Sequence, residues 1–250
     1  MTEVVELVHL AVRSGIATIT LDSPANRNAL SAPLRGQLLD ALECTAGDGA
    51  VRVVVLDHTG PAFCAGMDLT EPPDAVKELP LILERIWTHP TPVVAKLAGH
   101  ARAGGIGLVG AADIAVAAQH ATFAFTEVRL GLVPAVISVT VLPRLLPSAA
   151  HELFLTGETF DATRAVAIGL LNSAVPADQL DAEVSRFTGM LVKGSPEALS
   201  LTKQLLRART MAQDFPAMLE LSAAQFASAQ GQEGIRAFTE KRPPSWVPAS

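Results

Sequence analysis

The chain of 250 residues is 49% hydrophobic and 18% charged, a balance that allows a sizeable core and excludes a disordered or coiled-coil protein. Its 25 acidic residues exceed its 19 lysines and arginines, which leaves a formal net charge of −6. This deficit of positive charge argues against a protein that coats nucleic acid, because binding to phosphates needs a surplus of lysine and arginine.

The first half of the chain alternates predicted strands and helices. Two runs rich in β-branched residues, 8–12 and 16–21, flank a turn at 13–15 and predict a hairpin. Continuous apolar runs are typical of strands covered on both faces, whereas leucines at helical spacing after a capping serine predict a helix. On these patterns the expected strands are 51–56, 92–97, 114–117 and 122–125, and the expected helices are 31–47, 75–87 and 104–112.

From about residue 136 onward the pattern is mostly helical. The expected helices are 149–155, 162–168, 180–192, 196–208, 215–227 and 233–241, and a proline-rich tail covers 243–250. Strand, crossover helix and strand in succession are the pattern of a parallel α/β sheet. We therefore predict an α/β core over residues 1–195 and a helical C-terminal region over residues 196–250.

Two glycine-rich segments lie where a predicted strand leads towards a helix. Segment 58–69 follows the strand 51–56, and segment 99–108 follows the strand that ends at Leu97. Small residues at such junctions leave backbone N–H groups unshielded, and ligands of open α/β sheets bind at the carboxyl ends of the strands. Two converging N–H groups there can hold a developing oxyanion, although glycines at turns more often serve tight packing alone.

Competing functional motifs are missing from the sequence. It contains no dinucleotide-binding G-x-G-x-x-G, no P-loop and no G-x-S-x-G nucleophile elbow. Cys44 and Cys64 provide no disulfide framework, and the six histidines show no zinc-binding spacing, so we expect no metal. An acidic N-terminus, and uncharged stretches shorter than the roughly 20 residues of a spanning helix, lead us to expect a soluble cytoplasmic protein.

Six segments, in order along the chain, resemble the crotonase (enoyl-CoA hydratase/isomerase) superfamily. They are 26–30 (NRNAL), 62–69 (AFCAGMDL), 104–108 (GGIGL), 112–117 (ADIAVA), 123–134 (FAFTEVRLGLVP) and 237–241 (AFTEK). The resemblance covers nearly the whole chain and implies a spiral of ββα units with a helical C-terminal trimerisation region. It also implies acyl-CoA thioesters as substrates and homotrimers or dimers of trimers as the assembly. Coenzyme A would enter as part of the substrate, with no other cofactor and with no nucleic-acid or membrane partner.

The resemblance assigns the family's oxyanion hole to two backbone N–H groups, those of Met67 and Gly104. Gly104 would open a helix, where the macrodipole adds positive potential at the thioester oxygen. Two fixed donors in a dry pocket stabilise the enolate that forms when a proton α to a thioester is moved. Because only the backbone of Met67 is needed, Met67→Leu should be tolerated.

Coenzyme A contacts are implied by the same resemblance. Arg27 matches the position that meets the CoA phosphates, and Ala29 and Ala65 match contacts to the adenine end. The crevice is further implied to include Gly66, Asp68, Leu69 and Gly105. Phe238 and Lys241 match adenine and phosphate contacts that are made across a subunit boundary.

Hydratases of this family generally use two glutamates, and the sequence keeps one of them. Glu127 matches the second position, whereas the first falls on Gly107. Adding water to a double bond needs one group to orient and deprotonate the water and a source of a proton for the α-carbon, and two carboxyls can share these tasks. Moving a proton from C2 to C4 of a 3-enoyl thioester needs only one base. We therefore predict Glu127 as the acid/base, with a pKa raised by apolar neighbours such as Phe125 and Leu130. A surface ion pair with Arg129 is the alternative for this residue.

Two further departures from the family pattern concern the acyl pocket and its surroundings. Branched side chains over 134–140 stand where many relatives have glycines, which alters the shape of the acyl site. Arg102 replaces a commonly apolar residue and can pair with Glu127, with an acidic acyl group or with neither. Asp113 follows the glycine-opened helix, so it is a poor candidate for the missing catalytic partner.

Three functional hypotheses follow from the sequence. The first is an enoyl-CoA hydratase that stabilises a thioester enolate in a backbone oxyanion hole and uses Glu127 as acid/base. The second is a Δ3,Δ2-enoyl-CoA isomerase, which fits a single carboxyl better. The third is a trimer that binds CoA thioesters without chemistry.

Overall fold

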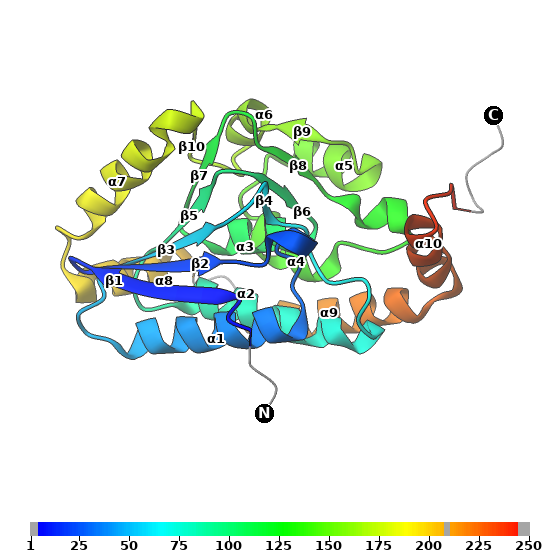
Figure 1. Ribbon diagram of the computed structural model, residues 1–250, viewed down its shortest axis with the longest axis horizontal. Coiled ribbons are helices and arrows are strands. Elements are labelled where there is room, and N and C mark those ends of the chain that lie inside the picture. The colour runs from blue at the N-terminus through cyan, green and yellow to red at the C-terminus, as the bar shows by residue number, and fades with distance from the viewer. Residues whose placement is uncertain (1–4, 208–210, 245–250) are drawn as a thin grey trace.

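The computed structural model describes residues 5–207 and 211–244, and its strands form two sheets (Figure 1). The larger sheet has the order β1-β2-β3-β5-β7-β10, and the smaller has the order β4-β6-β8-β9. The strands are β1 (Val8–Arg13), β2 (Ile16–Leu21), β3 (Val53–His58), β4 (Ala62–Cys64), β5 (Val93–Leu97), β6 (His100–Arg102), β7 (Ile114–Ala118), β8 (Thr122–Ala124), β9 (Phe160–Asp161) and β10 (Ser173–Val175).

After the hairpin of β1 and β2, strands that follow each other in sequence belong to different sheets: one strand of each pair β3/β4, β5/β6, β7/β8 and β9/β10 lies in the larger sheet and the other in the smaller. β3, β5 and β7 pair in parallel in the larger sheet, and β4, β6 and β8 pair in parallel in the smaller one. The antiparallel hairpin of β1 and β2 extends the larger sheet, and β9 closes the smaller sheet antiparallel to β8. The result is the spiral of ββα units expected from the crotonase resemblance.

Helices cover these sheets and fill the space between them. They are α1 (Ala32–Gly47), α2 (Leu79–Thr88), α3 (Gly104–Ala111), α4 (Ala135–Val141), α5 (Pro147–Thr156), α6 (Ala162–Ala167), α7 (Leu180–Leu191), α8 (Pro196–Arg207), α9 (Met211–Ala227) and α10 (Ala229–Thr239). Short 3₁₀ helices are η1 (Pro24–Asn26), η2 (Pro73–Glu78), η3 (Thr126–Leu130) and η4 (Ala177–Gln179). Every residue of α3 is buried, which explains why that helix is built from glycine and small apolar residues.

Most predicted elements are confirmed, but α4, β9 and β10 were not predicted, and some other elements differ in bounds or type. The expected helix over 75–87 is divided into η2 and α2, and the expected strand over 51–56 begins two residues later, at Val53. The short strands β4 and β6 lie inside the glycine-rich segments, where the sequence predicted turns alone. Predictions for residues 1–4, for residue 208 and for the tail beyond Pro244 lie outside the described residues.

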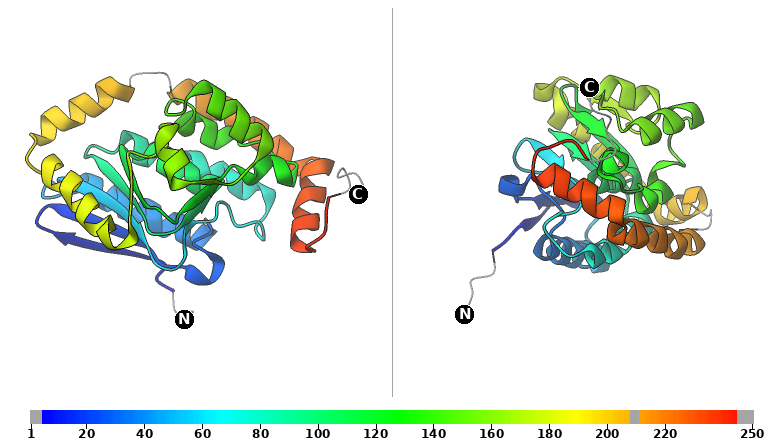
Figure 2. Two further views of the ribbon diagram at one scale, coloured as in Figure 1. Left: turned by 90° about the horizontal axis from the view of Figure 1, so that it is seen from above. Right: turned by 90° about the vertical axis from the view of Figure 1, so that its right-hand side faces the viewer.

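The C-terminal helices follow the core and are fixed to it at two places. Asp113, at the end of α3, accepts from Lys203 Nζ at 2.8 Å and from Arg207 Nη2 at 2.6 Å, which fastens α8. Asp113 thus anchors α8 and does not line the pocket described below, which agrees with its being a poor candidate for a catalytic partner. Farther along, α9 packs on α4 and η2, and α10 packs on η3 at the end of the molecule opposite α7 (Figures 1 and 2). Across the described residues, no helix has the length and apolar character needed to cross a membrane.

Candidate active site

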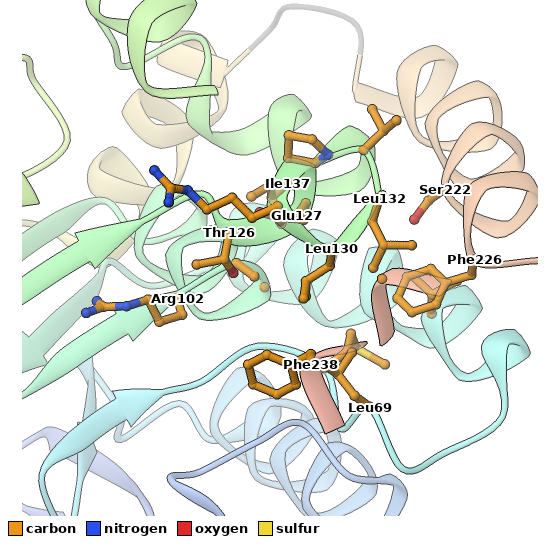
Figure 3. A pocket seen from close by; sticks show the side chains of 18 of the residues that line it. Leu69, Arg102, Thr126, Glu127, Leu130, Leu132, Ile137, Ser222, Phe226 and Phe238 are labelled. Carbon is orange, nitrogen blue, oxygen red and sulfur yellow. The ribbon is translucent and has the colours of Figure 1, made fainter. Parts of the chain in front are cut away.

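A pocket of about 460 Å³ lies at the end of α3 that begins with Gly104 (Figure 3). It is formed by the loop after β4, the start of α3, η3 with the loop into α4, and helices α9 and α10. Its buried wall is apolar and includes Val76, Leu79, Leu132, Val136 and Ile137. Its rim carries three exposed arginines, Arg27, Arg129 and Arg242. The pocket therefore combines an apolar interior with a cationic rim.

The loop after β4 is held against the segment that follows η1. Leu30 and Met67 form a single parallel β-bridge. The Leu30 N–H donates to the Gly66 carbonyl at 2.8 Å. The Ala65 N–H donates to the Arg27 carbonyl at 3.1 Å. Neither bond uses the N–H of Met67, a residue that lines the pocket.

Asn28 fixes this segment from beneath. The residue is fully buried and has a φ of 54°, in the left-handed region that asparagine tolerates. Its Oδ1 accepts from the Ser23 N–H at 2.7 Å. Its Nδ2 donates to the carbonyls of Thr59 at 3.0 Å and Ala62 at 2.8 Å. The segment carrying Arg27 is thereby tied to β4 and to the end of β3.

The start of α3 adjoins the same loop. Gly104 is the first residue of α3, so its N–H has no acceptor within the helix. Gly66 has a φ of +94°, which L side chains rarely adopt, and a Cβ there would lie 3.2 Å from the Gly104 nitrogen. The N–H groups of Met67 and Gly104 therefore belong to adjoining turns at one end of the pocket. The positive end of the α3 dipole lies there as well.

Glu127 lies on η3 and lines the same pocket. The residue is partly exposed, yet its Oε2 atom is buried and has no hydrogen-bond partner among the described residues. Loss of water penalises the charged form of a carboxyl. Burial therefore raises the pKa of Glu127 from 4.5 to about 7, as the sequence predicted in direction. Both protonation states are populated at neutral pH.

The two arginines considered as partners of Glu127, Arg102 and Arg129, form hydrogen bonds with other groups. Arg129 Nε donates to the Thr156 carbonyl at 3.1 Å, and no ion pair of the described residues joins it to Glu127. Arg102 donates to the Thr122 carbonyl, and its Nη2 donates to Thr122 Oγ1 at 2.7 Å. Of the alternatives for Arg102, pairing with Glu127 is therefore wrong, because β8 holds the guanidinium.

Gly107 lies within α3, and Ile137 of α4 packs directly against it. A Cβ on Gly107 would lie 2.7 Å from Ile137 Cγ2 and 3.3 Å from Ile137 Cβ. Leu83 Cδ1 would lie 3.4 Å from the same atom. Thr140 Oγ1, also on α4, donates to the Gly107 carbonyl at 3.2 Å. The space that a glutamate at 107 would enter is therefore filled by Ile137.

The structure divides the predicted site residues into two groups. Those that line the pocket are Glu127, Met67, Gly104, Arg27, Ala65, Leu69 and Phe238. Those that do not line it are Ala29, Gly66, Asp68, Gly105 and Lys241. No group of three or more His, Cys, Asp or Glu side chains able to hold a metal ion occurs in the described ranges.

Local packing explains two of the residues outside the pocket. Asp68 Oδ1 accepts from the N–H of Thr70 at 3.0 Å and from its hydroxyl at 2.7 Å, so this carboxylate caps its own turn. A Cβ on Gly105 would lie 2.4 Å from the Cys64 carbonyl oxygen, so Gly105 serves the close approach of α3 to β4. Gly104 lines the pocket, whereas Gly105 serves packing.

Phe238 lines the pocket of its own chain, although the resemblance implied a contact across a subunit boundary. The reason is the close docking of α10. A Cβ on Gly234 would lie within van der Waals overlap of the Leu130 carbonyl oxygen, so the backbone of α10 rests directly on η3. This docking brings Phe238 to the pocket without a second chain.

Comparison with known proteins agrees with this fold and pocket. A profile of the enoyl-CoA hydratase/isomerase family matches residues 11–248. The chain belongs to this family. It is similar to a mouse mitochondrial protein named enoyl-CoA hydratase domain-containing protein 3, with 33% identity over 94% of this chain and 82% of that protein.

Two solved structures show the same architecture. A crystal structure of an enoyl-CoA hydratase from Mycobacterium avium has a TM-score of 0.90 and 44% identity, and the match covers 96% of this chain and 99% of that one. A crystal structure of methylmalonyl CoA decarboxylase has a TM-score of 0.85 and 25% identity, and the match covers 98% of this chain and 99% of that one. The crotonase-like α/β fold is thereby confirmed.

This hydratase/isomerase family member also has pocket residues that sequence reasoning missed. Ser222 and Phe226 of α9 face the pocket at helical i, i+4 spacing, and Arg242 follows α10. The spacing of Ser222 and Phe226 indicates a shared helix face. Only the tertiary packing of α9 on α4 shows what that face contacts.

Proposed function

We propose that this protein is an enoyl-CoA hydratase that transfers protons with a single carboxyl, that of Glu127. The observation that carries the proposal is the burial of this carboxyl, with a pKa of about 7, in a pocket that Met67 and Gly104 also line. A carboxyl poised near neutral pH suits general acid–base catalysis, and unused N–H groups suit a developing negative charge. The likeness to a crystallised enoyl-CoA hydratase supports hydration as the reaction.

In the proposed reaction, ionised Glu127 takes a proton from water while the oxygen of that water bonds to C3 of a 2-enoyl thioester. The π electrons of C2–C3 move towards the thioester, whose oxygen becomes negative. Protonated Glu127 then returns its proton to C2, the thioester carbonyl re-forms, and a 3-hydroxyacyl thioester results. Glu127 ends ionised, as it began, so the cycle needs no cofactor other than the coenzyme A of the substrate.

The backbone N–H groups of Met67 and Gly104 are proposed to hold the thioester oxygen during this reaction. Removing one donor from such a hole typically costs roughly 3 kcal/mol of transition-state stabilisation. The side chain of Met67 takes no part in this interaction. Met67→Leu is therefore expected to keep turnover.

Coenzyme A is proposed to lie over the cationic rim. Arg27 would meet the phosphates, and Arg129 adds positive charge to the same rim, whereas Arg242 is paired with Glu233 and Glu240. Phe238 is 60% exposed and offers a ring on which the adenine can stack. Ala65 and Leu69 line the pocket between these contacts.

The Glu127→Gln variant tests the proposal because it keeps the size of the side chain and removes its acid–base function. With a 2-enoyl-CoA substrate we expect turnover to fall about 100-fold or more, since a positioned acid–base group contributes on that scale. Unchanged turnover of every enoyl-CoA would show that Glu127 is not the catalytic group. A parent protein that binds CoA thioesters and turns none over would instead be a binding protein.

Double-bond isomerisation is the second candidate function, and the packing of Gly107 against Ile137 favours it. The space that a glutamate at position 107 would need is filled by the hydrocarbon side chain of Ile137. Glu127 therefore has no carboxyl partner on α3 to orient water. A single carboxyl can move a proton from C2 to C4 of a 3-enoyl thioester. Incubation with each substrate separates the reactions. Hydration removes the absorbance of the 2-enoyl thioester, whereas isomerisation creates it from the 3-enoyl thioester.

We further propose a homotrimer, or a dimer of trimers, that uses the C-terminal helices. Leu201, Leu205 and Leu206 of α8 are 57%, 76% and 80% exposed. Leu201 and Leu205 share a helix face at i, i+4 spacing. A cluster of exposed leucines on one helix is typical of an interface between protein chains.

A further inference from the structure

Ser222 is a buried polar residue in the pocket that the proposed chemistry does not use. It is 4% exposed, lies on α9 and lines the pocket. Its hydroxyl has no hydrogen-bond partner among the described residues. Figure 3 shows the oxygen turned away from α9, towards Leu132 and the interior of the pocket.

This orientation differs from the usual behaviour of serine in a helix. A helical serine commonly bonds to the carbonyl four residues earlier or is hydrated at the surface. Ser222 makes no such bond with the described residues, and it lies in the wall of the pocket rather than on the outer surface, so its hydroxyl is open to whatever occupies the pocket. A hydroxyl that faces a ligand pocket without a partner from the protein is free to form a hydrogen bond with a group on the ligand.

The surroundings of Ser222 define the chemistry of that partner. The nearest pocket residues in Figure 3, Leu132 and Phe226, are apolar, so a charged group there would lose its water without gaining an opposite charge. Four arginines line the pocket. Arg102 is bound to Thr122 on the far side (Figure 3), and Arg129 donates to the Thr156 carbonyl. Arg242 is paired with Glu233 at 2.7 Å and with Glu240 at 2.6 Å, and Arg27 lies on the segment after η1. The partner of Ser222 is therefore uncharged.

We infer that Ser222 is a specificity residue that recognises an uncharged oxygen substituent on the acyl chain, remote from the thioester. A serine hydroxyl both donates and accepts, so it suits a hydroxyl or a keto group on the substrate. The inference rests on the proposed function, because it places the acyl chain of an enoyl-CoA in this pocket. It adds the substrate class, which is oxygenated rather than plain aliphatic acyl chains.

The test uses pairs of 2-enoyl-CoA thioesters of equal chain length, hexenoyl, octenoyl and decenoyl, each with and without a terminal hydroxyl. The parent protein should show a kcat/KM about tenfold higher for the hydroxylated member of at least one pair, since a site built for a hydrogen bond rejects an analogue that lacks the group. Ser222→Ala should abolish this preference. Ser185→Ala changes an exposed serine of α7 outside the pocket and should keep it.

Equal kcat/KM within every pair, with a ratio that Ser222→Ala does not change, would overturn the inference while the proposed function stands. Failure of the parent protein to turn over any enoyl-CoA would refute the proposed function instead. In that case the dissociation constants of the saturated acyl-CoA and its hydroxylated counterpart decide the inference. Tighter binding of the hydroxylated ligand by the parent protein but not by Ser222→Ala supports it, and equal binding overturns it.

Discussion

At the scale of single residues, the burial of Glu127 has consequences for both catalysis and stability. The same loss of water that brings its pKa to about 7 makes its ionised form costly in the folded protein. The folded chain therefore holds this proton more tightly than the unfolded chain, whose value is near 4.5. The contribution of Glu127 to the free energy of unfolding is fully present below about 4.5 and is lost as the pH rises through about 7.

The Glu127→Gln variant should remove this pH dependence. At about pH 8 we expect the variant to be more stable than the parent by about 1–3 kcal/mol, less than the full value of the shift because part of the side chain faces the pocket. The difference should shrink towards about pH 5. Urea unfolding of both proteins measures it, with Glu158→Gln, at an exposed glutamate, as the control. Identical pH dependence in parent and Glu127→Gln would contradict the account.

Single residues also show how far the sequence predicts the site. Glu127, Met67 and Gly104 were predicted together and do line one pocket, because each lies in a short motif beside a strand end. Gly105 was predicted with them, but it packs on Cys64. A glycine that exposes an N–H and a glycine that permits close packing look alike in a sequence. Only their neighbours in space distinguish them.

At the scale of elements, α3 and α4 form one packing unit in which Gly107 and Ile137 depend on each other. We expect Gly107→Glu alone to destabilise the protein, because its Cβ would lie 2.7 Å from Ile137 Cγ2. Combining it with Ile137→Ala removes the 2.7 Å contact, leaves a 3.3 Å contact with Cβ of residue 137, and is expected to let the new carboxyl reach the pocket. The double variant should recover stability and raise the ratio of hydration to isomerisation about tenfold or more, since a positioned second carboxyl assists the attacking water.

Thermal unfolding and assays with 2-enoyl and 3-enoyl thioesters measure these effects. Gly36→Glu is the matched control, since a Cβ at this position of α1 meets nothing within 4 Å. Ile137→Ala alone reports the effect of the cavity. Two results would show that Ile137 does not fill the place of a glutamate at position 107. One is a Gly107→Glu variant as stable as the parent, and the other is a double variant with an unchanged ratio of hydration to isomerisation.

Elements differ in how well their sequences predict them. Five strands of the larger sheet were predicted, because β1 and β2 are rich in β-branched residues and β3, β5 and β7 contain long apolar runs, whereas its short strand β10 was not. The strands β4 (Ala62–Cys64) and β6 (His100–Arg102) have three residues each, too few to show an alternating pattern. They pair only because the spiral brings them side by side, and that pairing is a property of the tertiary fold.

At the scale of the whole molecule, the pocket is closed by helices far from the catalytic motifs in sequence. Ser222 and Phe226 on α9 and Phe238 on α10 complete a site that begins at Arg27. No local pattern joins these segments. The family resemblance alone brought Phe238 into the sequence prediction, and it implied a contact from another chain.

The exposed leucines of α8 give a prediction for the assembly. Charged residues at Leu205 and Leu206 should dissociate the proposed trimer, because desolvating two carboxylates in an apolar interface is costly. Both side chains are largely exposed in the single chain, so its fold should persist. Sedimentation velocity measures the mass of Leu205→Glu/Leu206→Glu, with Ser185→Glu, at an exposed position of α7, as the control. A parent protein that sediments as a monomer would refute the proposed trimer.

In the proposed reaction, Glu127 moves a proton at C2 of a thioester whose oxygen is held by the N–H groups of Met67 and Gly104. Solvent-deuterium exchange into C2 of a saturated acyl-CoA tests it most directly, because the exchange requires the enolate and neither hydration nor isomerisation. We expect the parent protein to incorporate deuterium at C2 and Glu127→Gln to incorporate none above the rate in buffer. Exchange by Glu127→Gln at the rate of the parent protein would contradict it.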